Sequence, residues 1–315
     1  KLAIVETTAA DAIQLREDPK VTEKAEGYLL EVNSNGIIIT GKDPVGVFYG
    51  GQSLAQIVAA DGKGGWQAPF LKIRDWPATP TRYVFGGQPV SPGLIRALAR
   101  CKINYYSAIQ TPSPENRAMA EKYCVKLVPF VQFNLAWGAN PEEFTERAAG
   151  EALSAIGTGR RNPCPSHPGV WAAYFKQMDA MIDASNSDLV NINADEMYVE
   201  QAGARWNVCA RCRARNLSGQ ELWVATLKKI QGHLHERGRK LLMIDSILGY
   251  KGISHPNDAA NDWSKIPDLL PTEVKKDMVI FLWHWNSPVY DALVRNGITL
   301  LRWNLAATFP KEHGF

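Results

Sequence analysis

The sequence lacks any apolar run that approaches the roughly 18 residues needed for a membrane-spanning helix. It also lacks a basic run, because 35 basic and 32 acidic side chains are mixed along 315 residues and leave a net charge of +3. Nucleic acid is therefore not expected as a partner. Hydrophobic residues make up 45% of the chain, which is enough to bury a large core.

Cysteine is scarce and odd in number, with five residues, so it leaves the redox compartment open. Cys209 and Cys212 form a C-x-x-C pair, which can hold zinc, form a disulfide or remain as two free thiols. Structural zinc requires four ligands and there is no second C-x-x-C pair, so neither a metal nor a cofactor is expected. No targeting signal can be read, and the start at Lys1 suggests a piece of a longer protein.

Residues 1–78 are predicted to form a small α/β accessory domain. Two β-rich runs, 27–32 and 36–40, are joined by Asn33-Ser-Asn-Gly36, whose residues tolerate the positive φ of a tight hairpin. The two runs should therefore pair antiparallel. A helical pattern follows over residues 44–60.

Gly50 and Gly51 lie inside this predicted helix, where each is unfavourable by about 1 kcal/mol relative to alanine. Close packing of the helix on the sheet is the reason we expect for them. Residues 73–80 contain two prolines and are interpreted as a stiff connection to the second domain.

Residues 79–315 alternate between strand and helix patterns, which favours a parallel sheet because parallel strands need long crossovers. Seven strands are predicted, at residues 83–87, 103–110, 127–133, 189–194, 240–246, 279–285 and 298–303. Helices are predicted at 92–102, 114–123, 168–184, 219–237 and 288–296. No Gly-x-Gly-x-x-Gly loop follows the first strand, so an eight-stranded TIM-type (β/α)8 barrel, with its last strand beyond Phe315, explains the pattern better than a doubly wound sheet.

The fourth predicted strand ends in two adjacent carboxylates, Asp195 and Glu196. Alternation along the strand places Val190, Ile192 and Ala194 on an apolar face and Asn191, Asn193 and Asp195 on the other. In a barrel of parallel strands, catalytic residues lie at the carboxyl ends of the strands. The alternative is that the two acids only cap the following loop.

Two stretches resemble glycoside hydrolase family 20, the β-N-acetylhexosaminidases. Residues 27–58 are similar to the small domain that precedes the barrel in that family, with matches at Gly36, Ile37, Gly46, Phe48, Tyr49, Gly50, Gln52, Leu54 and Gln56. Asp195-Glu196 resembles the catalytic Asp-Glu pair of the family, and Cys164-Pro-Ser-His-Pro168 resembles the segment before the helix that precedes the fourth strand.

The resemblance implies a retaining exo-glycosidase that removes terminal N-acetylhexosamine from a carbohydrate substrate, with the substrate's own acetamido oxygen as nucleophile. Glu196 would be the general acid and base, and Asp195 would orient the acetamido group. A raised pKa on Glu196 is expected from the neighbouring charge of Asp195. The resemblance also favours a periplasmic or secreted location.

Five further residues are candidates for sugar binding. Arg82 matches a sugar-binding arginine of the family, with an exposed structural arginine as the alternative. Trp283 and Trp285 share a face of the sixth strand and Trp303 ends the seventh, so they suit either stacking on a sugar or the barrel core. Asp245, near the end of the fifth strand, is an inward carboxylate or a loop cap.

The sequence departs from the family where His-x-Gly-Gly normally precedes Asp-Glu, because Asn191-Ile-Asn-Ala194 stands there. The first and third strands also lack their usual Asp, Arg and Pro-Gly-His residues. Two alternatives follow from these departures. One is a non-catalytic carbohydrate-binding protein on a degenerate hydrolase barrel, and the other is a glycosidase for a sugar without an acetamido group.

Overall fold

The computed structural model describes residues 12–133, 162–194, 207–245, 265–282 and 289–302. The chain divides into two compact units. The first contains residues 1–84, 90–106 and 118–126, and the second contains residues 85–89, 107–117 and 127–315. Each unit is described separately below.

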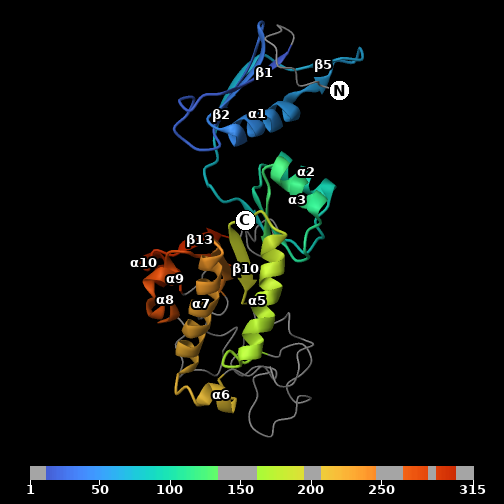
Figure 1. Ribbon diagram of the computed structural model, residues 1–315. Helices are drawn as coiled ribbons and strands as arrows, with labels where there is room; N and C mark the ends of the chain where they lie inside the picture. The colour runs from blue at the N-terminus through green and yellow to red at the C-terminus, as the bar shows by residue number, and fades with distance from the viewer. Residues whose placement is uncertain (1–11, 134–161, 195–206, 246–264, 283–288, 303–315) are drawn as a thin grey trace, which may run out of the picture. The chain divides into compact units, whose positions relative to one another are not determined.

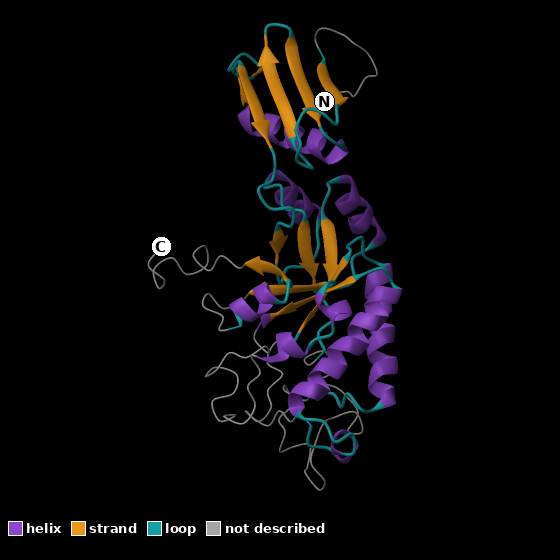
Figure 2. Ribbon diagram, turned by 90° about the vertical axis from the view of Figure 1, so that its left-hand side faces the viewer, coloured by secondary structure: helices purple, strands orange, loops and turns teal. Residues whose placement is uncertain are grey.

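The first unit is built on a four-stranded sheet with α1 across one face (Figure 2). Its strands, in spatial order, are β1 (Ile13–Glu17), β3 (Gly36–Gly41), β2 (Tyr28–Asn33) and β6 (Leu71–Asp75). Strands β2 and β3 pair antiparallel from Tyr28 opposite Gly41 to Asn33 opposite Gly36. The predicted hairpin is therefore confirmed.

Two strands of this sheet differ from the sequence prediction. Strand β1, which pairs parallel with β3, was not predicted. Strand β6 pairs antiparallel with β2, so residues 73–75 belong to the sheet and the predicted connection was wrong there. Leu71, Ile73 and Asp75 are half-buried while Lys72 and Arg74 are exposed. This period-two pattern is typical of a strand, and the prolines that follow at residues 77 and 80 obscured it.

Helix α1 (Pro44–Ile57) packs on this sheet. It begins with proline in its first turn and an Asp43 cap, whose Oδ1 accepts a hydrogen bond from the Gly46 amide at 2.8 Å. Tyr28, Leu30 and Ile39 from the sheet join Tyr49 and Leu54 from the helix in one buried core. A short hairpin of β4 (Ala59–Ala60) and β5 (Trp66–Gln67) follows the helix.

All seven strands predicted for the second domain are present, with shorter bounds. A three-stranded sheet has the order β7-β8-β9, and a four-stranded parallel sheet has the order β10-β11-β12-β13. A parallel bridge joins Phe130, just after β9, to Asn191 in β10. The bounds are β7 (Tyr83–Val84), β8 (Tyr105–Ala108), β9 (Lys126–Pro129), β10 (Leu189–Asn193), β11 (Lys240–Ile244), β12 (Met278–Leu282) and β13 (Thr299–Arg302).

The strands follow one another in chain order with helices between them, as Figure 1 shows by colour. The helices are α2 (Pro92–Arg100), α3 (Pro114–Lys122), α5 (Pro168–Asp183), α6 (Ala210–Arg213), α7 (Gly219–Glu236), α8 (Ile266–Leu269), α9 (Thr272–Lys275) and α10 (Tyr290–Arg295). The described residues therefore show an α/β arrangement with consecutive strands and no closed barrel. None of the described helices is long and apolar enough to cross a membrane.

The core of the second unit lies between its sheet and helices α5 and α7, which flank β10 in Figure 1. Tyr174 and Met178 from α5 and Trp223 and Leu227 from α7 are fully buried there. Helix α7 begins with a capping box, in which the Ser218 side chain and Glu221 satisfy each other's backbone amides.

Candidate active site

Strand β10 ends in a bulge directly before the predicted catalytic pair. In its pairing with β11, Asn191 lies opposite Leu242 and Asn193 lies opposite Met243, so Ile192 is the extra residue. The regular alternation predicted along this strand therefore stops at Asn191. Val190, Ile192 and Ala194 nevertheless all belong to the buried core. Bulges redirect the side chains that follow them and are frequent beside active sites.

Asn193 and Ala194 both have left-handed backbone conformations, with φ of 56° and 60°. Glycine adopts this conformation freely and asparagine tolerates it, but for alanine it is unfavourable by about 1–2 kcal/mol. These residues occupy the positions of the two family glycines noted in the sequence. Both residues therefore have a backbone conformation that glycine adopts more readily, and the strain falls on the two residues before Asp195.

Hydrogen bonds fix this turn. The Asn193 amide donates to Asn191 Oδ1 at 2.7 Å, and the Ala194 amide donates to the Ile192 carbonyl at 2.6 Å. On the other side, the Val131 amide donates to the Asn191 carbonyl at 2.8 Å. Asn191 thus uses its side chain to shape the turn, a local role that the sequence did not reveal.

A cluster of buried aromatic side chains lies in the same core as the end of β10. The Phe133 ring lies 5.6 Å from that of Trp171 and 5.0 Å from that of Tyr174, and the Tyr174 hydroxyl donates to the Val131 carbonyl at 2.8 Å. Burial raises the pKa of Tyr174 well above its usual value, so the hydroxyl remains a neutral donor. The backbone beside β10 is consequently held by rigid, buried groups.

Asp245 lies directly after β11 and is 1% exposed. Because β10 and β11 are parallel and Asn193 pairs with Met243, Asp245 lies at the same edge of the sheet as Ala194. Asn191, Asn193 and Asp245 are all buried polar residues at the carboxyl ends of these two strands. A polar strand-end edge of this kind is where a parallel α/β fold places its chemistry.

Five predicted site residues lie outside the residues that the structure describes: Asp195, Glu196, Trp283, Trp285 and Trp303. Some of them directly follow described residues in the sequence. Asp195 follows Ala194, and Trp283 follows the last residue of β12. Their roles remain predictions.

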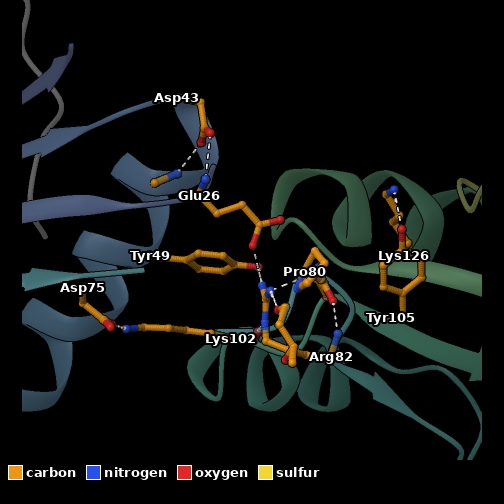
Figure 3. Close-up of polar contacts among 12 residues, drawn as sticks. Glu26, Asp43, Tyr49, Asp75, Pro80, Arg82, Lys102, Tyr105 and Lys126 are labelled. Carbon is orange, nitrogen blue, oxygen red and sulfur yellow. Dashed lines mark hydrogen bonds and ion pairs between the residues drawn. The ribbon is translucent and has the colours of Figure 1, made fainter. Parts of the chain in front are cut away.

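The Arg82 guanidinium is hydrogen-bonded to protein groups, so it differs from an arginine that is free to bind a sugar (Figure 3). Its Nη2 donates to Glu26 Oε2 at 2.6 Å and to the Tyr49 hydroxyl at 2.9 Å. Its Nε and Nη1 donate to three backbone carbonyls, those of Lys102, Thr79 and Pro80. A guanidinium has five N–H donors, and these five bonds engage all of them with protein acceptors.

Burial is the largest influence on Tyr49 and raises its pKa to about 12, although Arg82 acts in the opposite direction. The hydroxyl therefore stays neutral and can accept from Arg82. Asp43 Oδ2 in turn accepts from the Glu26 amide at 2.8 Å, which holds the partner of Arg82 in place. This geometry favours a structural role for Arg82 inside the first unit, and its assignment to sugar binding stays a prediction.

The C-x-x-C pair has a third member that the sequence argument did not include. Cys164 Sγ lies 3.4 Å from Cys209 Sγ and 3.6 Å from Cys212 Sγ. None of the five cysteines, all of which lie within the described residues, forms a disulfide in the structure. The three sulfurs are a candidate metal-binding group.

Comparison with known proteins gives the following relationships. Residues 1–76 match the family model of glycosyl hydrolase family 20, domain 2. A β-hexosaminidase of Porphyromonas gingivalis is 32% identical over 84 residues, which cover 25% of this chain and 11% of that protein. The resemblance to glycoside hydrolase family 20 is therefore confirmed.

The fold of nearly the whole chain is also shared with solved enzymes. A β-N-acetylhexosaminidase from Bacteroides fragilis has a TM-score of 0.68 at 19% identity, covering 92% of this chain and 63% of that one. A family 20 exo-β-N-acetylglucosaminidase from Vibrio harveyi, solved with N-acetylglucosamine, has a TM-score of 0.70 at 16% identity, covering 92% and 51%. The chain thus spans about half to two thirds of these enzymes, and at such identities the likeness shows the fold.

Proposed function

We propose that this family-20-like chain carries the catalytic machinery of a retaining exo-glycosidase that removes terminal N-acetylhexosamine residues from carbohydrates. Glu196 is the general acid and base, and Asp195 is its partner. Asp245, Trp283, Trp285 and Trp303 are proposed to contribute to the sugar pocket. Arg82 is kept as a predicted sugar-binding residue, although its hydrogen bonds favour a structural role.

The observation that carries the proposal is the strained turn at Asn193 and Ala194. Left-handed backbone at two successive non-glycine residues persists only when the surrounding structure imposes it, and such strain concentrates at functional sites. Here it falls directly before the two adjacent carboxylates, at the carboxyl end of a parallel strand.

The proposed reaction has two steps. In the first, Glu196 donates its proton to the glycosidic oxygen while the acetamido oxygen attacks the anomeric carbon, so that the leaving group departs as an alcohol and an oxazolinium ion forms. Asp195 accepts a hydrogen bond from the acetamido N–H and stabilises the positive charge. In the second step, the Glu196 carboxylate takes a proton from water, which attacks the same carbon and restores the acetamido group. Two inversions give overall retention.

The same proposal includes a (β/α)8 barrel as the catalytic domain, with residues 1–78 as its accessory domain. Seven consecutive strands, from β7 to β13, support this architecture. An eighth strand outside the described residues would close the barrel, since closure requires strand number and stagger to match.

The decisive substitution is Glu196→Gln, which keeps the shape of the side chain but removes its proton. Turnover of an aryl N-acetylglucosaminide should fall by roughly 100-fold or more, because general acid–base catalysis contributes about that much. Circular dichroism and the thermal midpoint should remain unchanged. Glu273→Gln is the matched control, because Glu273 is exposed in the short helix α9.

Unchanged turnover in Glu196→Gln would contradict the assignment. Sugar binding by the wild-type chain without any turnover would instead support the carbohydrate-binding alternative, for which the replaced histidine and glycines are the main argument. A stable mimic of the oxazoline intermediate distinguishes the proposed enzyme from a glycosidase for a sugar without an acetamido group. Only a pocket built for the acetamido mechanism should bind the mimic much more tightly than the product sugar.

A further inference from the structure

Three cysteines from two separated segments of the chain meet in the second unit. Cys164 precedes α5, whereas Cys209 and Cys212 flank the start of the short helix α6. Cys164 and Cys212 are buried, and Cys209 is half-buried. All three sulfur atoms lie within 4.8 Å of one another. The other two cysteines, Cys101 and Cys124, are not members of this group.

The spacing of the sulfurs suits a shared metal ion. Around a tetrahedral zinc ion with Zn–S bonds of about 2.3 Å, neighbouring sulfurs are about 3.8 Å apart. Cys164 Sγ is 3.4 Å from Cys209 Sγ and 3.6 Å from Cys212 Sγ, so small movements complete the geometry. A single disulfide would engage two of the three sulfurs and would leave the third without a function.

Two polar groups also contact these sulfurs. The Cys212 amide points at Cys209 Sγ at 3.4 Å, and the Ser166 hydroxyl lies 3.1 Å from Cys212 Sγ. Three thiolates and one divalent ion would sum to a single negative charge. Arg211, Arg213 and Arg215 are exposed and lie close to Cys212 in the sequence.

The site also has an oxygen donor beside a hollow. Ser166 lines a hollow of about 580 Å³ together with Trp171, Arg211, Arg215 and Lys229. A zinc ion with three protein ligands completes its coordination with a water molecule or another oxygen ligand. Either Ser166 Oγ or a water molecule bound to it can occupy that position.

We propose that Cys164, Cys209 and Cys212 bind one zinc ion as its three protein ligands, which joins the segment before α5 to α6. In the sequence, Asp195 and Glu196 lie between Ala194, the residue after β10, and this site. The zinc site does not depend on the glycosidase assignment.

The first test uses the wild-type chain, purified without a histidine tag or chelator. Elemental analysis should find about one zinc per chain. A thiol-alkylating reagent should modify only Cys101 and Cys124 at first, and the three clustered cysteines only after a strong chelator is added. Cobalt(II) added to the stripped chain should give the thiolate charge-transfer absorption of a tetrahedral site. None of these readings requires activity.

Variants then assign the ligands. Cys164→Ser should weaken zinc binding by more than the roughly 10–100-fold that follows loss of an outer-shell partner. Cys101→Ser, at an exposed cysteine outside the cluster, is the matched control and should retain the zinc. If Cys164→Ser fails to fold, the alkylation pattern of the wild-type chain decides the question.

Two results would overturn the proposal. One is a disulfide between any two of the three cysteines in the native chain, detected by mass spectrometry without reduction. The other is a chain that contains no zinc, takes up none from solution and exposes all five thiols to alkylation without a chelator.

Discussion

At the scale of single residues, Asn193 and Ala194 have a backbone conformation that glycine adopts more readily than other residues. Both have positive φ although neither is glycine. The hydrogen bonds from Asn193 to the Asn191 side chain and from Ala194 to the Ile192 carbonyl stabilise the turn. The absence of glycine at these two positions therefore does not prevent a left-handed backbone before Asp195, which weakens one argument for a non-catalytic protein.

Ala194→Gly should stabilise the chain by about 0.5–1 kcal/mol, because relief of the left-handed strain exceeds the extra entropy of glycine in the unfolded state. Denaturant unfolding measures this difference. Ala184→Gly is the control, since Ala184 has an ordinary φ of −82° at the end of α5 and should be destabilised or unchanged. If Ala194→Gly is less stable than the wild type, φ at this residue is not strained.

Arg82 has hydrogen-bond partners that lie far from it in the sequence. Its sequence position suggested sugar binding, but its five N–H donors are engaged by Glu26, Tyr49 and three backbone carbonyls. The planar guanidinium is suited to holding several acceptors at once, which a lysine could not do. Partners this far apart in sequence, 56 residues in the case of Glu26, cannot be read from a local motif.

At the scale of elements, α1 approaches its sheet through one glycine of a pair. A Cβ added to Gly50 would lie 2.4 Å from Ile39 Cγ2 and 3.1 Å from Tyr28 Cδ2, whereas one added to Gly51 would meet nothing within 4 Å. The sequence prediction of close packing therefore holds for Gly50 alone. Helix periodicity places neighbouring residues about 100° apart, so only one of them can face the sheet.

These two glycines give a matched pair of substitutions. Gly50→Ala should destabilise the chain by about 1–3 kcal/mol, as overpacking does. Gly51→Ala should stabilise it by about 0.5–1 kcal/mol, because alanine is the better helix former and has space there. Urea denaturation of each variant would measure this change in the free energy of unfolding. Equal effects of the two substitutions would show that α1 does not approach the sheet through Gly50.

At the scale of the whole molecule, hydrogen bonds and an ion pair link distant segments within the first compact unit. In the first unit, Lys102 Nζ donates to Asp75 Oδ2 at 2.9 Å (Figure 3). It also donates to the Tyr28 hydroxyl at 2.8 Å, so the turn that follows α2 is joined to the sheet. Burial alone would raise the pKa of Asp75, but hydrogen bonds from Lys102 and Tyr28 lower it overall. For Lys102, burial acts to lower the pKa, and the bonds to Tyr28 and Asp75 raise it overall.

These shifts set the pH range in which the tie stabilises the fold. The contribution of Asp75 is present above its ordinary pKa of 3.8 and disappears as the pH falls through its lower folded value. The contribution of Lys102 is complete below its ordinary pKa of 10.5 and disappears as the pH rises through its higher folded value. Between these limits the pair remains charged.

Asp75→Asn should therefore lower the thermal midpoint near neutral pH, and the difference from the wild type should narrow as the pH falls below 3.8. Glu31→Gln, which removes a largely exposed pair with Lys72, should change the midpoint little at any pH. A difference between Asp75→Asn and the wild type that stays constant into strong acid would contradict the role of the charged carboxylate.

The sequence by itself determined the order of the elements in this protein. The hairpin, α1 and all seven strands from β7 to β13 follow from period-two and helical patterns and from turn and capping residues, which act over a few positions. Strand β6 was not predicted, because the prolines at residues 77 and 80 obscured its alternating pattern of burial. The family of the first domain could also be read from the residues, because its matches are dense within one short stretch.

Only the tertiary structure decided which of these residues work together. It brought Cys164 to within 3.6 Å of Cys212, 48 residues away, and it placed Glu26, Tyr49 and three backbone carbonyls around Arg82. It also placed the strain of β10 on Asn193 and Ala194, through a register with β11 that no single strand contains. Contacts between distant segments depend on how the elements pack, and a local pattern carries no information about its eventual neighbours.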